Sequence, residues 1–239
     1  TVQDLFRPQI KLFGKQAKEI INMDLTNKNA AFLGDSITCG FGASDNEHVY
    51  HQLIKKEYKL NNVYNLGVYG SRIAKQYVKS ANEEFDETFF ERAQRIPDDA
   101  DMVIVFGGTN DYGHGDAPLG RFSDRTVDTF YGACHVLMGY LSERFVGRPV
   151  IFMTPLHRTG EDAKMVNGIK TEHILKTYVD IIKQVAEYYS IPVLDMFGES
   201  GMQPNLESHN KCFFIDGLHL NDKGHERVAH ILGKYLERL

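Results

Sequence analysis

The sequence predicts an α/β fold, in which helices cover both faces of a parallel sheet in a doubly wound sandwich. Five short apolar runs recur along the chain, each bounded by turn residues and without a clean in-and-out alternation. Such runs are typical of strands that are buried on both faces. Amphipathic segments lie between the runs, and this alternation of strand and helix is the pattern of doubly wound α/β proteins.

The first half of the chain supplies three of the strands. The first strand is expected at Ala30–Leu33 and is followed by the amphipathic segment Val49–Leu60. The second and third are expected at Val63–Leu66 and Met102–Phe106, and a long, mixed helical segment follows at Phe122–Phe145. These runs are rich in Val, Ile, Leu, Phe and Met, as buried strands are.

The second half repeats the same alternation. The fourth strand, Val150–Met153, precedes Ile169–Tyr189, where apolar residues recur every three or four positions. The fifth strand is expected at Val193–Met196, and the last helix at Asp222–Leu239 carries its apolar residues on one stripe. That spacing marks one face of a helix that packs against a sheet.

The organisation along the chain favours a single domain over residues 1–239. We find no linker, no low-complexity segment and no internal repeat. Residues 1–28 precede the first strand, and we expect them to form an extension, a hairpin or a helix, that packs on the domain. The formal net charge of −5 and the pI near 6.0 argue against a nucleic-acid-binding protein.

Composition also bounds the location. The chain has no run of 18 apolar residues, so no membrane span is expected, and no signal peptide is visible. The chain has three cysteines. This small and odd number argues against a disulfide framework and favours a reducing compartment. A cytoplasmic location is therefore expected, with a removed leader as the alternative.

The residues that follow the expected strands carry the chemistry. In doubly wound folds, ligands bind beyond the carboxyl ends of the strands. Ser36 follows the first strand in the segment GDSIT, and Asp216 and His219 stand in DGLH before the last helix. One serine, one aspartate and one histidine at the same edge are the groups that nucleophilic acyl transfer requires.

The roles follow from what each group can do. A serine hydroxyl is a weak nucleophile without a base, so His219 is the candidate base for Ser36. Asp216, three residues before it, would fix the imidazole tautomer and stabilise the imidazolium. Acyl transfer also needs donors for the tetrahedral oxyanion, and the candidates are the backbone N–H groups of Ser36 and Gly70 and the side-chain amide of Asn110.

At this point four motifs together resemble a known family. GDSIT, N-x-G-x-x-G at Asn65–Gly70, GGTND at Gly107–Asp111 and DGLH resemble, in order, the four blocks of the SGNH hydrolases, also called the GDSL lipase and esterase superfamily. The match runs from Gly34 to His219. The first block reads GDSI where the family name has GDSL, a difference that touches no catalytic atom.

The resemblance implies a flavodoxin-like three-layer α/β/α sandwich with a five-stranded parallel sheet. It implies ester hydrolysis without a cofactor and without a metal ion. Ser36 would be the nucleophile, Asp216 and His219 would complete the triad, and Gly70 and Asn110 would complete the oxyanion hole with the Ser36 N–H.

Other readings of the same residues are open at the level of sequence. Ser36 could be a helix N-cap and His219 a buried structural histidine. The G-x-S-x-G elbow of ordinary α/β-hydrolases is absent, since Thr38 stands where the second glycine would be. A thiol nucleophile at Cys39 has no base beside it in sequence, and Asp111 could join Asp216 and His219 around a divalent ion.

The sequence says less about the ester. The loops expected around the site are polar, and a long-chain lipase would need a broad apolar cleft or lid. We therefore expect a short acyl group, foremost acetyl, on a polar alcohol such as a carbohydrate. The alternatives are a lipase or lysophospholipase activity, an acyltransferase, and a non-catalytic ligand-binding module. The candidates for the substrate rim are Arg72, Tyr112, His114, His157 and Arg158, with the rings of Phe41 and Tyr69 in the same loops.

Overall fold

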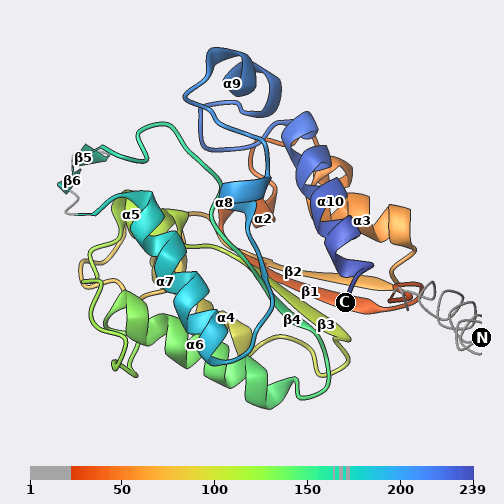
Figure 1. Cartoon of the computed structure of the whole chain (residues 1–239), viewed down its shortest axis with the longest axis horizontal. Coiled ribbons are helices and arrows are strands. Elements are labelled where there is room, and N and C mark those ends of the chain that lie inside the picture. Colours follow the sequence, from red (N-terminus) through yellow and green to blue (C-terminus); the bar gives the residue numbers. More distant parts are fainter. Residues whose placement is uncertain (1–22, 164, 167–168, 171–172) are drawn as a thin grey trace, which may run out of the picture.

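A parallel sheet forms the centre of the molecule. The computed structural model describes residues 23–239 except 164, 167–168 and 171–172. Within them the central sheet has five strands, all parallel, in the order β2-β1-β3-β4-β7 (Figure 1). This is the flavodoxin-like order, with its switch point between β1 and β3. The strands are β1 (Asn29–Gly34), β2 (Asn62–Gly67), β3 (Met102–Phe106), β4 (Val150–Met153) and β7 (Val193–Leu194).

Helices cover both faces of this sheet and give the three layers. α3 (Tyr50–Tyr58) and α10 (Asp222–Leu236) pack side by side on one face (Figure 1). α4 (Phe89–Ala93), α6 (Phe130–Arg144) and α7 (Leu175–Tyr188) cover the other face. The predicted α/β sandwich is thus confirmed.

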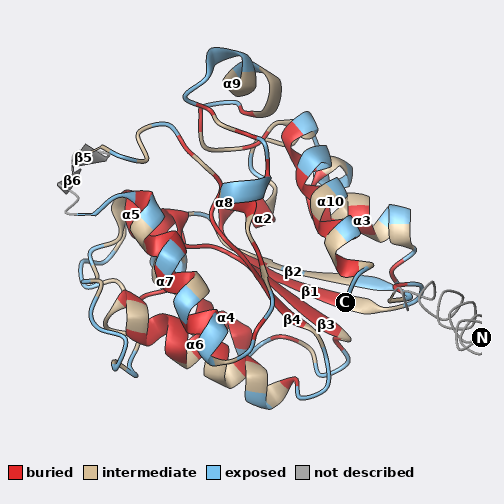
Figure 2. Ribbon diagram, in the orientation of Figure 1, coloured by how far each residue is buried: buried red, intermediate tan, exposed pale blue. Residues whose placement is uncertain are grey.

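The side chains on the two faces of the sheet pack into two separate hydrophobic cores. In β1, Ala30 and Phe32 pack with the α3 and α10 side, whereas Ala31 and Leu33 pack with the α4, α6 and α7 side. Such alternation follows from the two-residue period of a strand. β3 and β4 are buried along their whole length, and β1 is buried from its second residue on (Figure 2). β2 is an edge strand and is half-exposed, unlike the fully buried strand that was expected there.

Short elements lie around the carboxyl ends of the strands, where the candidate residues were expected. These are α2 (Ser36–Cys39), the 3₁₀ turns Asn46–His48 and Glu83–Asp86, α5 (Thr109–His114), α8 (Met196–Glu199) and α9 (Glu207–Phe213). A hairpin of two antiparallel strands, β5 (Met165–Val166) and β6 (Ile169–Lys170), precedes α7. Each strand has two residues.

Three predicted boundaries were wrong, and a capping side chain decides two of them. The segment Phe122–Phe145 becomes helical only at Phe130, after Thr129 caps it by accepting a hydrogen bond from the Gly132 N–H. The fifth strand ends at Leu194, because the Asp195 carboxylate caps α8 at that point.

The third wrong boundary concerns the helix that was expected at Ile169–Tyr189. Its first residues form strand β6 of the hairpin, and α7 begins only at Leu175. The apolar spacing continues across this junction, so spacing alone placed the helix start too early.

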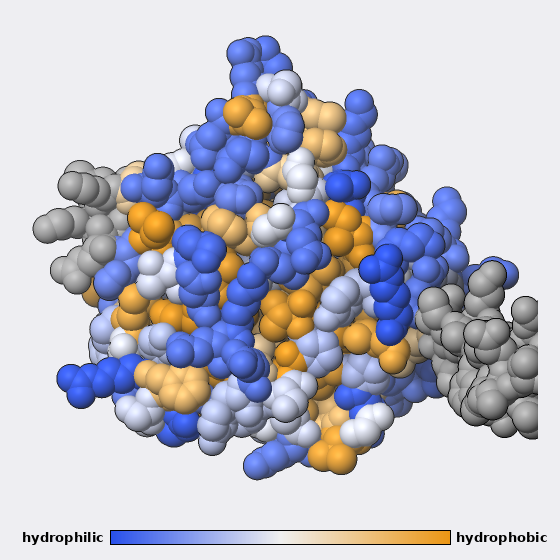
Figure 3. Space-filling view, in the orientation of Figure 1, coloured by the Kyte–Doolittle hydropathy of each residue, from blue (hydrophilic) through white to orange (hydrophobic). Residues whose placement is uncertain are grey.

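The chain before β1 is only partly described. Residues 1–22 of the expected extension lie outside the described residues. Met23 donates its N–H to Glu237 O at 3.2 Å, and Leu25 is buried in the α3 and α10 core. None of the helices in the described ranges combines the length and apolar character needed to cross a bilayer. On the face shown in Figure 3, hydrophobic residues lie among hydrophilic ones.

Candidate active site

Ser36 lies between the end of β1 and the first turn of α2. Its neighbour Asp35 caps α2, since Asp35 Oδ1 accepts a hydrogen bond from the Ile37 N–H at 3.0 Å. Burial raises the pKa of Asp35 to about 6, against the hydrogen bond from Ile37 that acts to lower it. Because Asp35 performs the capping, the Ser36 hydroxyl is available to another partner.

That partner is His219, and Asp216 lies behind it. Ser36 Oγ lies 2.9 Å from His219 Nε2, and His219 Nδ1 lies 2.7 Å from Asp216 Oδ2. Beside an ionised Asp216, Nδ1 donates its hydrogen and Nε2 is left to accept the hydroxyl proton. Burial works to raise the pKa of Asp216, but hydrogen bonds from the His219 ring and from the backbone outweigh it and hold that pKa below its ordinary value.

A narrow turn between α9 and α10 carries this aspartate and histidine. An antiparallel bridge between Phe214 and Leu220 closes the turn. Inside it, Asp216 Oδ1 accepts the backbone N–H of His219 at 2.7 Å. Gly217 has a φ of 81°, a left-handed conformation that glycine adopts without strain. The turn therefore fixes the imidazole against its carboxylate through both backbone and side-chain bonds.

The candidate oxyanion donors lie on the segments that follow β2 and β3. Gly70 has a φ of 64°, and within the described ranges its N–H donates to no protein group. Asn110, on α5, donates one amide hydrogen to Ser71 O at 3.1 Å. An amide carries two hydrogens, so Asn110 keeps a second one for an oxyanion.

Asp111 fastens the loop that carries Gly70. Its two carboxylate oxygens accept the backbone N–H groups of Ile73 (3.0 Å) and Ala74 (2.9 Å). Burial raises the pKa of Asp111 to about 6, although both of these hydrogen bonds act to lower it. Asp111 is therefore a structural neighbour of Asn110, and its carboxylate faces the backbone of the loop.

Arg92 has a role at the site that the sequence did not predict. This α4 residue is 1% exposed and donates from Nη1 to the carbonyls of Gly34 (2.7 Å) and Leu66, and from Nη2 to Ser71 Oγ (2.8 Å). It thus ties together the ends of β1 and β2 and the Gly70 loop. Burial lowers its pKa to about 10, which leaves it charged. No local signal reveals this role, because an arginine on an amphipathic helix reads as a surface residue.

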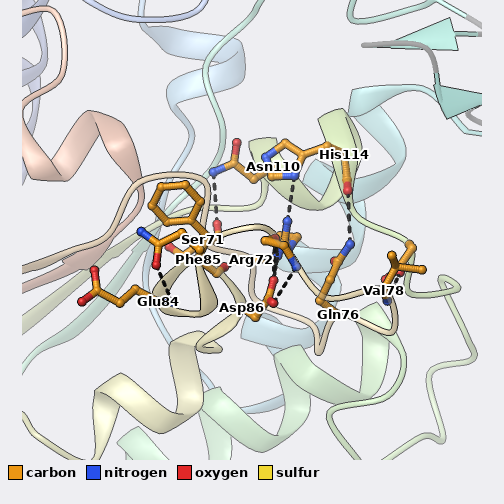
Figure 4. Close-up of polar contacts among 12 residues, drawn as sticks. Ser71, Arg72, Gln76, Val78, Glu84, Phe85, Asp86, Asn110 and His114 are labelled. Atoms are coloured by element: carbon orange, nitrogen blue, oxygen red, sulfur yellow. Dashed lines mark hydrogen bonds and ion pairs between the residues drawn. The ribbon is translucent and has the colours of Figure 1, made fainter.

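The five rim candidates lie at different depths. Tyr112, expected at the rim, is buried instead (1% exposed), and its hydroxyl donates to Gly160 O at 2.5 Å. Arg72 and Arg158 are also buried, at 3% and 7% exposure. His114 is half-buried and accepts a hydrogen bond from Arg72, as Figure 4 shows.

The loop after β4 supplies the remaining polar groups. His157 Nδ1 lies 2.8 Å from Glu161 Oε2, and its ring packs against Phe197 with the ring centroids 3.8 Å apart. Arg158 donates to Thr109 O at 3.1 Å, at the start of α5. The same loop contacts the turn that carries Asp216 and His219, because the Thr159 N–H donates to Gly217 O at 2.8 Å.

Two exposed rings lie near the histidine of the site. Phe41 is 42% exposed and lies edge-on to His219, with the ring centroids 4.5 Å apart. Tyr69 is 41% exposed and lies edge-on to Phe41 at 5.7 Å. Both rings were expected in rim loops; Phe41 contacts the histidine directly, and Tyr69 contacts Phe41.

The described part of the chain holds no group of three or more His, Cys, Asp or Glu side chains that could bind a metal ion. The arrangement considered above, with Asp111 beside Asp216 and His219, is not formed, since Asp111 faces the loop backbone. Cys39, Cys134 and Cys212 are free thiols.

Comparisons with known proteins show the family and the fold of the chain. Residues 32–227 match the model of the GDSL-like lipase/acylhydrolase family. The chain shares 31% identity with a protein of known crystal structure from Lactobacillus plantarum, covering 88% of this chain and 97% of that one, with a TM-score of 0.77. A search of curated proteins finds no match.

More distant structures share the fold. A lipase/acylhydrolase from Enterococcus faecalis has 18% identity and a TM-score of 0.60, covering 88% of this chain and 95% of that one. An acetyl xylan esterase has 19% identity and a TM-score of 0.59, covering 87% and 98%.

Proposed function

The chain belongs to the GDSL-like lipase/acylhydrolase family and is a carboxylic ester hydrolase, and we propose that Ser36 is its nucleophile. His219 is the general base and Asp216 orients it. The observation that carries this assignment is the hydrogen-bonded chain from Ser36 Oγ through the His219 ring to Asp216, with distances of 2.9 and 2.7 Å. A nucleophile, a base and an orienting group within hydrogen-bond reach are what covalent acyl transfer requires.

The reaction follows from these positions. Ser36 Oγ attacks the ester carbonyl while His219 Nε2 takes its proton, and Asp216 stabilises the imidazolium that forms. The Ser36 and Gly70 N–H groups and the second Asn110 amide hydrogen stabilise the oxyanion. His219 then gives its proton to the leaving alcohol. Water, activated by the same histidine, releases the acyl group from Ser36 in the second half of the reaction.

The proposed substrate is a short acyl ester, foremost an acetyl ester, of a polar alcohol such as a carbohydrate. Polar side chains near the triad support it. His114 accepts a hydrogen bond from Arg72, and His157 pairs with Glu161 on the loop that donates Thr159 N–H to Gly217 O at 2.8 Å. Such groups suit the hydroxyl groups of a polar alcohol. The acetyl xylan esterase that shares this fold supports an acetylated carbohydrate as the substrate class.

Hydrolysis of p-nitrophenyl acetate, butyrate and octanoate tests both parts of the proposal. We expect the wild type to act fastest on the acetate. Ser36→Ala should lower kcat by more than about a thousandfold, because the acyl-enzyme no longer forms. Ser123→Ala, at an exposed loop position, is the matched control and should retain wild-type rates.

The outcomes separate the alternatives. Equal trace rates in the wild type and Ser36→Ala would overturn the nucleophile and favour a binding module. A rate that rises from two to eight acyl carbons would overturn the short-acyl assignment in favour of a lipase. Transfer of the acetyl group to an added alcohol, in preference to water, would identify an acyltransferase on the same triad.

A further inference from the structure

His114 stands beside the candidate oxyanion donors. It lies four residues after Asn110 on α5, so both side chains project from the same face of the helix. Figure 4 shows the two side chains next to each other above the loop that carries Ser71 and Arg72. A Cβ built on Gly70 would lie 3.8 Å from His114 Cε1. The imidazole therefore borders both Gly70 and Asn110.

Arg72 decides which nitrogen of His114 carries the hydrogen. Arg72 Nη1 lies 2.8 Å from His114 Nδ1. A guanidinium only donates hydrogen bonds, so Nδ1 must accept, and the hydrogen of the neutral ring is on Nε2. Burial, together with the positive charges of Arg72 and Arg158, lowers the pKa of His114 to about 4. The ring is thus a neutral donor at physiological pH and has no free lone pair with which to act as a base.

Arg72 is itself held on its other side. Its Nη2 donates to Asp86 Oδ1 at 2.7 Å and to Phe85 O at 3.2 Å. Asp86 is fixed in turn by the Ser80 backbone and hydroxyl. These bonds form a chain from Asp86 through Arg72 to the imidazole, and a side chain held in this way loses little entropy when it binds a ligand.

The outer nitrogen of His114, Nε2, forms no hydrogen bond with any of the described residues. It is not one of their fully buried, unpartnered polar atoms, and the residue as a whole is half-buried. Nε2 therefore keeps some exposure beside Gly70. A fixed neutral donor in that place suits an uncharged acceptor, such as the oxygen of a hydroxyl group.

We propose that the His114 Nε2–H binds a hydroxyl oxygen of the leaving alcohol, and that Arg72 is the positioning residue that keeps this hydrogen on Nε2. The proposal rests on the proposed function and names the part of the substrate that the site recognises. It predicts selectivity for esters of polyhydroxylated alcohols over esters whose alcohol has no acceptor.

Two substrates and two variants test this role. Monoacetylated methyl glucoside has free hydroxyl groups, whereas phenyl acetate has no acceptor beyond the ester. His114→Leu should lower kcat/KM for the glucoside about 10- to 100-fold, the effect of one lost hydrogen bond in the site. It should change phenyl acetate hydrolysis by less than about threefold. His114→Gln, whose amide can donate from a similar place, should recover most of the loss.

The results distinguish this inference from the proposed function. An equal loss on both substrates in His114→Leu would overturn the hydroxyl-binding role, because the effect would then lie at the reacting ester. A wild type that hydrolyses phenyl acetate but not the glucoside would overturn the proposed substrate class, and the role of His114 would fall with it.

A spectroscopic measurement tests the tautomer without using activity. The ¹⁵N shifts of the His114 ring should show hydrogen on Nε2 alone at pH 7, and the ring should still be neutral at pH 5. A mixture of tautomers, or a cationic ring at pH 5, would overturn the part assigned to Arg72.

Discussion

At the scale of single residues, the motifs divide structural and chemical work between neighbours. Asp35 caps α2, which leaves the next hydroxyl, that of Ser36, for His219. Asp111 fastens a loop by two backbone bonds, and Asn110 beside it uses one amide hydrogen on Ser71 O and has the other for its proposed role as an oxyanion donor. A carboxylate in each pair accepts backbone donors that would otherwise be buried without partners, which would be costly.

This division leads to a prediction for Asn110. Asn110→Ala removes an oxyanion donor and should lower kcat about 100- to 1000-fold, while KM changes by less than about threefold. Steady-state kinetics on p-nitrophenyl acetate measures both. Asn205→Ala, at an exposed position outside the site, is the control and should leave both constants unchanged. A rise in KM with an unchanged kcat would contradict the assignment, because it would mean that Asn110 only binds the ground state.

At the scale of elements, the position of the proposed nucleophile, Ser36, depends on the close contact between the end of β2 and α2. A Cβ built on Gly67, at the end of β2, would lie 2.3 Å from Cys39 N and 2.7 Å from Thr38 C. Both are backbone atoms of the short helix that begins with Ser36. This contact gives a physical reason for the first glycine of the N-x-G-x-x-G motif: any side chain there would push α2 off the sheet.

Gly67→Ala should therefore damage activity as well as stability. We expect it to destabilise the fold by about 1–3 kcal/mol, as overpacking does, and to lower kcat by displacing Ser36 from His219. Thermal unfolding and kinetics measure the two effects. Gly139→Ala is the matched control: it lies within α6, its added Cβ would meet Tyr189 at no less than 3.2 Å, and activity should not change. Full activity in Gly67→Ala would show that α2 tolerates the shift.

The same scale shows which parts of the fold can be predicted from the sequence. The five strands and the positions of the motifs could be predicted, because a buried strand and a turn glycine leave local signals. The start of α6 and the end of β7 could not, since the caps Thr129 and Asp195 decide them against the apolar spacing. The start of α7 could not either, because the apolar spacing runs on through strand β6. The role of Arg92 could not either, because it arises only when three segments meet in space.

The depth at which the rim residues are buried could not be predicted from the sequence either. Tyr112 and Arg158 follow strands and are polar or aromatic, so the sequence placed them at the substrate entrance. In the structure the two side chains pack against each other, with the Arg158 guanidinium 5.6 Å from the centre of the Tyr112 ring, and both are buried. Position along the chain indicates which edge of the sheet a residue lies near, but not how deep its side chain lies.

At the scale of the whole molecule, the strand order brings the separate motifs to one place. In a flavodoxin-like sheet the chain crosses from one side of β1 to the other, so the loops after β1 and β3 diverge and leave a crevice between them. Ser36 follows β1 and Asn110 follows β3, on the two sides of this switch point. The turn with Asp216 and His219 then covers the crevice from the start of α10.

Folding buries an acidic group, Asp111, and a basic group, His51, and shifts their pKa values in opposite directions. Burial raises the pKa of Asp111 to about 6, whereas in the unfolded chain it returns to its ordinary value near 3.8. Burial lowers the pKa of His51 to about 4 from 6.5. Between pH 4 and 6 the folded protein thus holds a proton on Asp111 that the unfolded chain loses, and lacks a proton on His51 that the unfolded chain takes up.

These two shifts act on stability with opposite signs. The Asp111 contribution is complete below pH 3.8 and is lost as the pH rises through 6. The His51 contribution is complete above pH 6.5 and is lost as the pH falls through 4. Each proton changes the slope of the unfolding free energy by up to about 1.4 kcal/mol per pH unit.

Two variants should therefore change the slope of the unfolding free energy against pH, between pH 4 and 6, in opposite directions. Asp111→Asn removes the term that opposes acid unfolding, so its stability should fall more steeply from pH 6 to pH 4 than that of the wild type. His51→Gln keeps a donor for Thr38 O, which the histidine contacts at 3.0 Å, and its stability should fall less steeply. Urea unfolding at half-unit pH steps gives the three slopes, and the constant offset from each substitution does not affect them. Three parallel slopes would show that neither group carries its proton differently in the folded and unfolded chains.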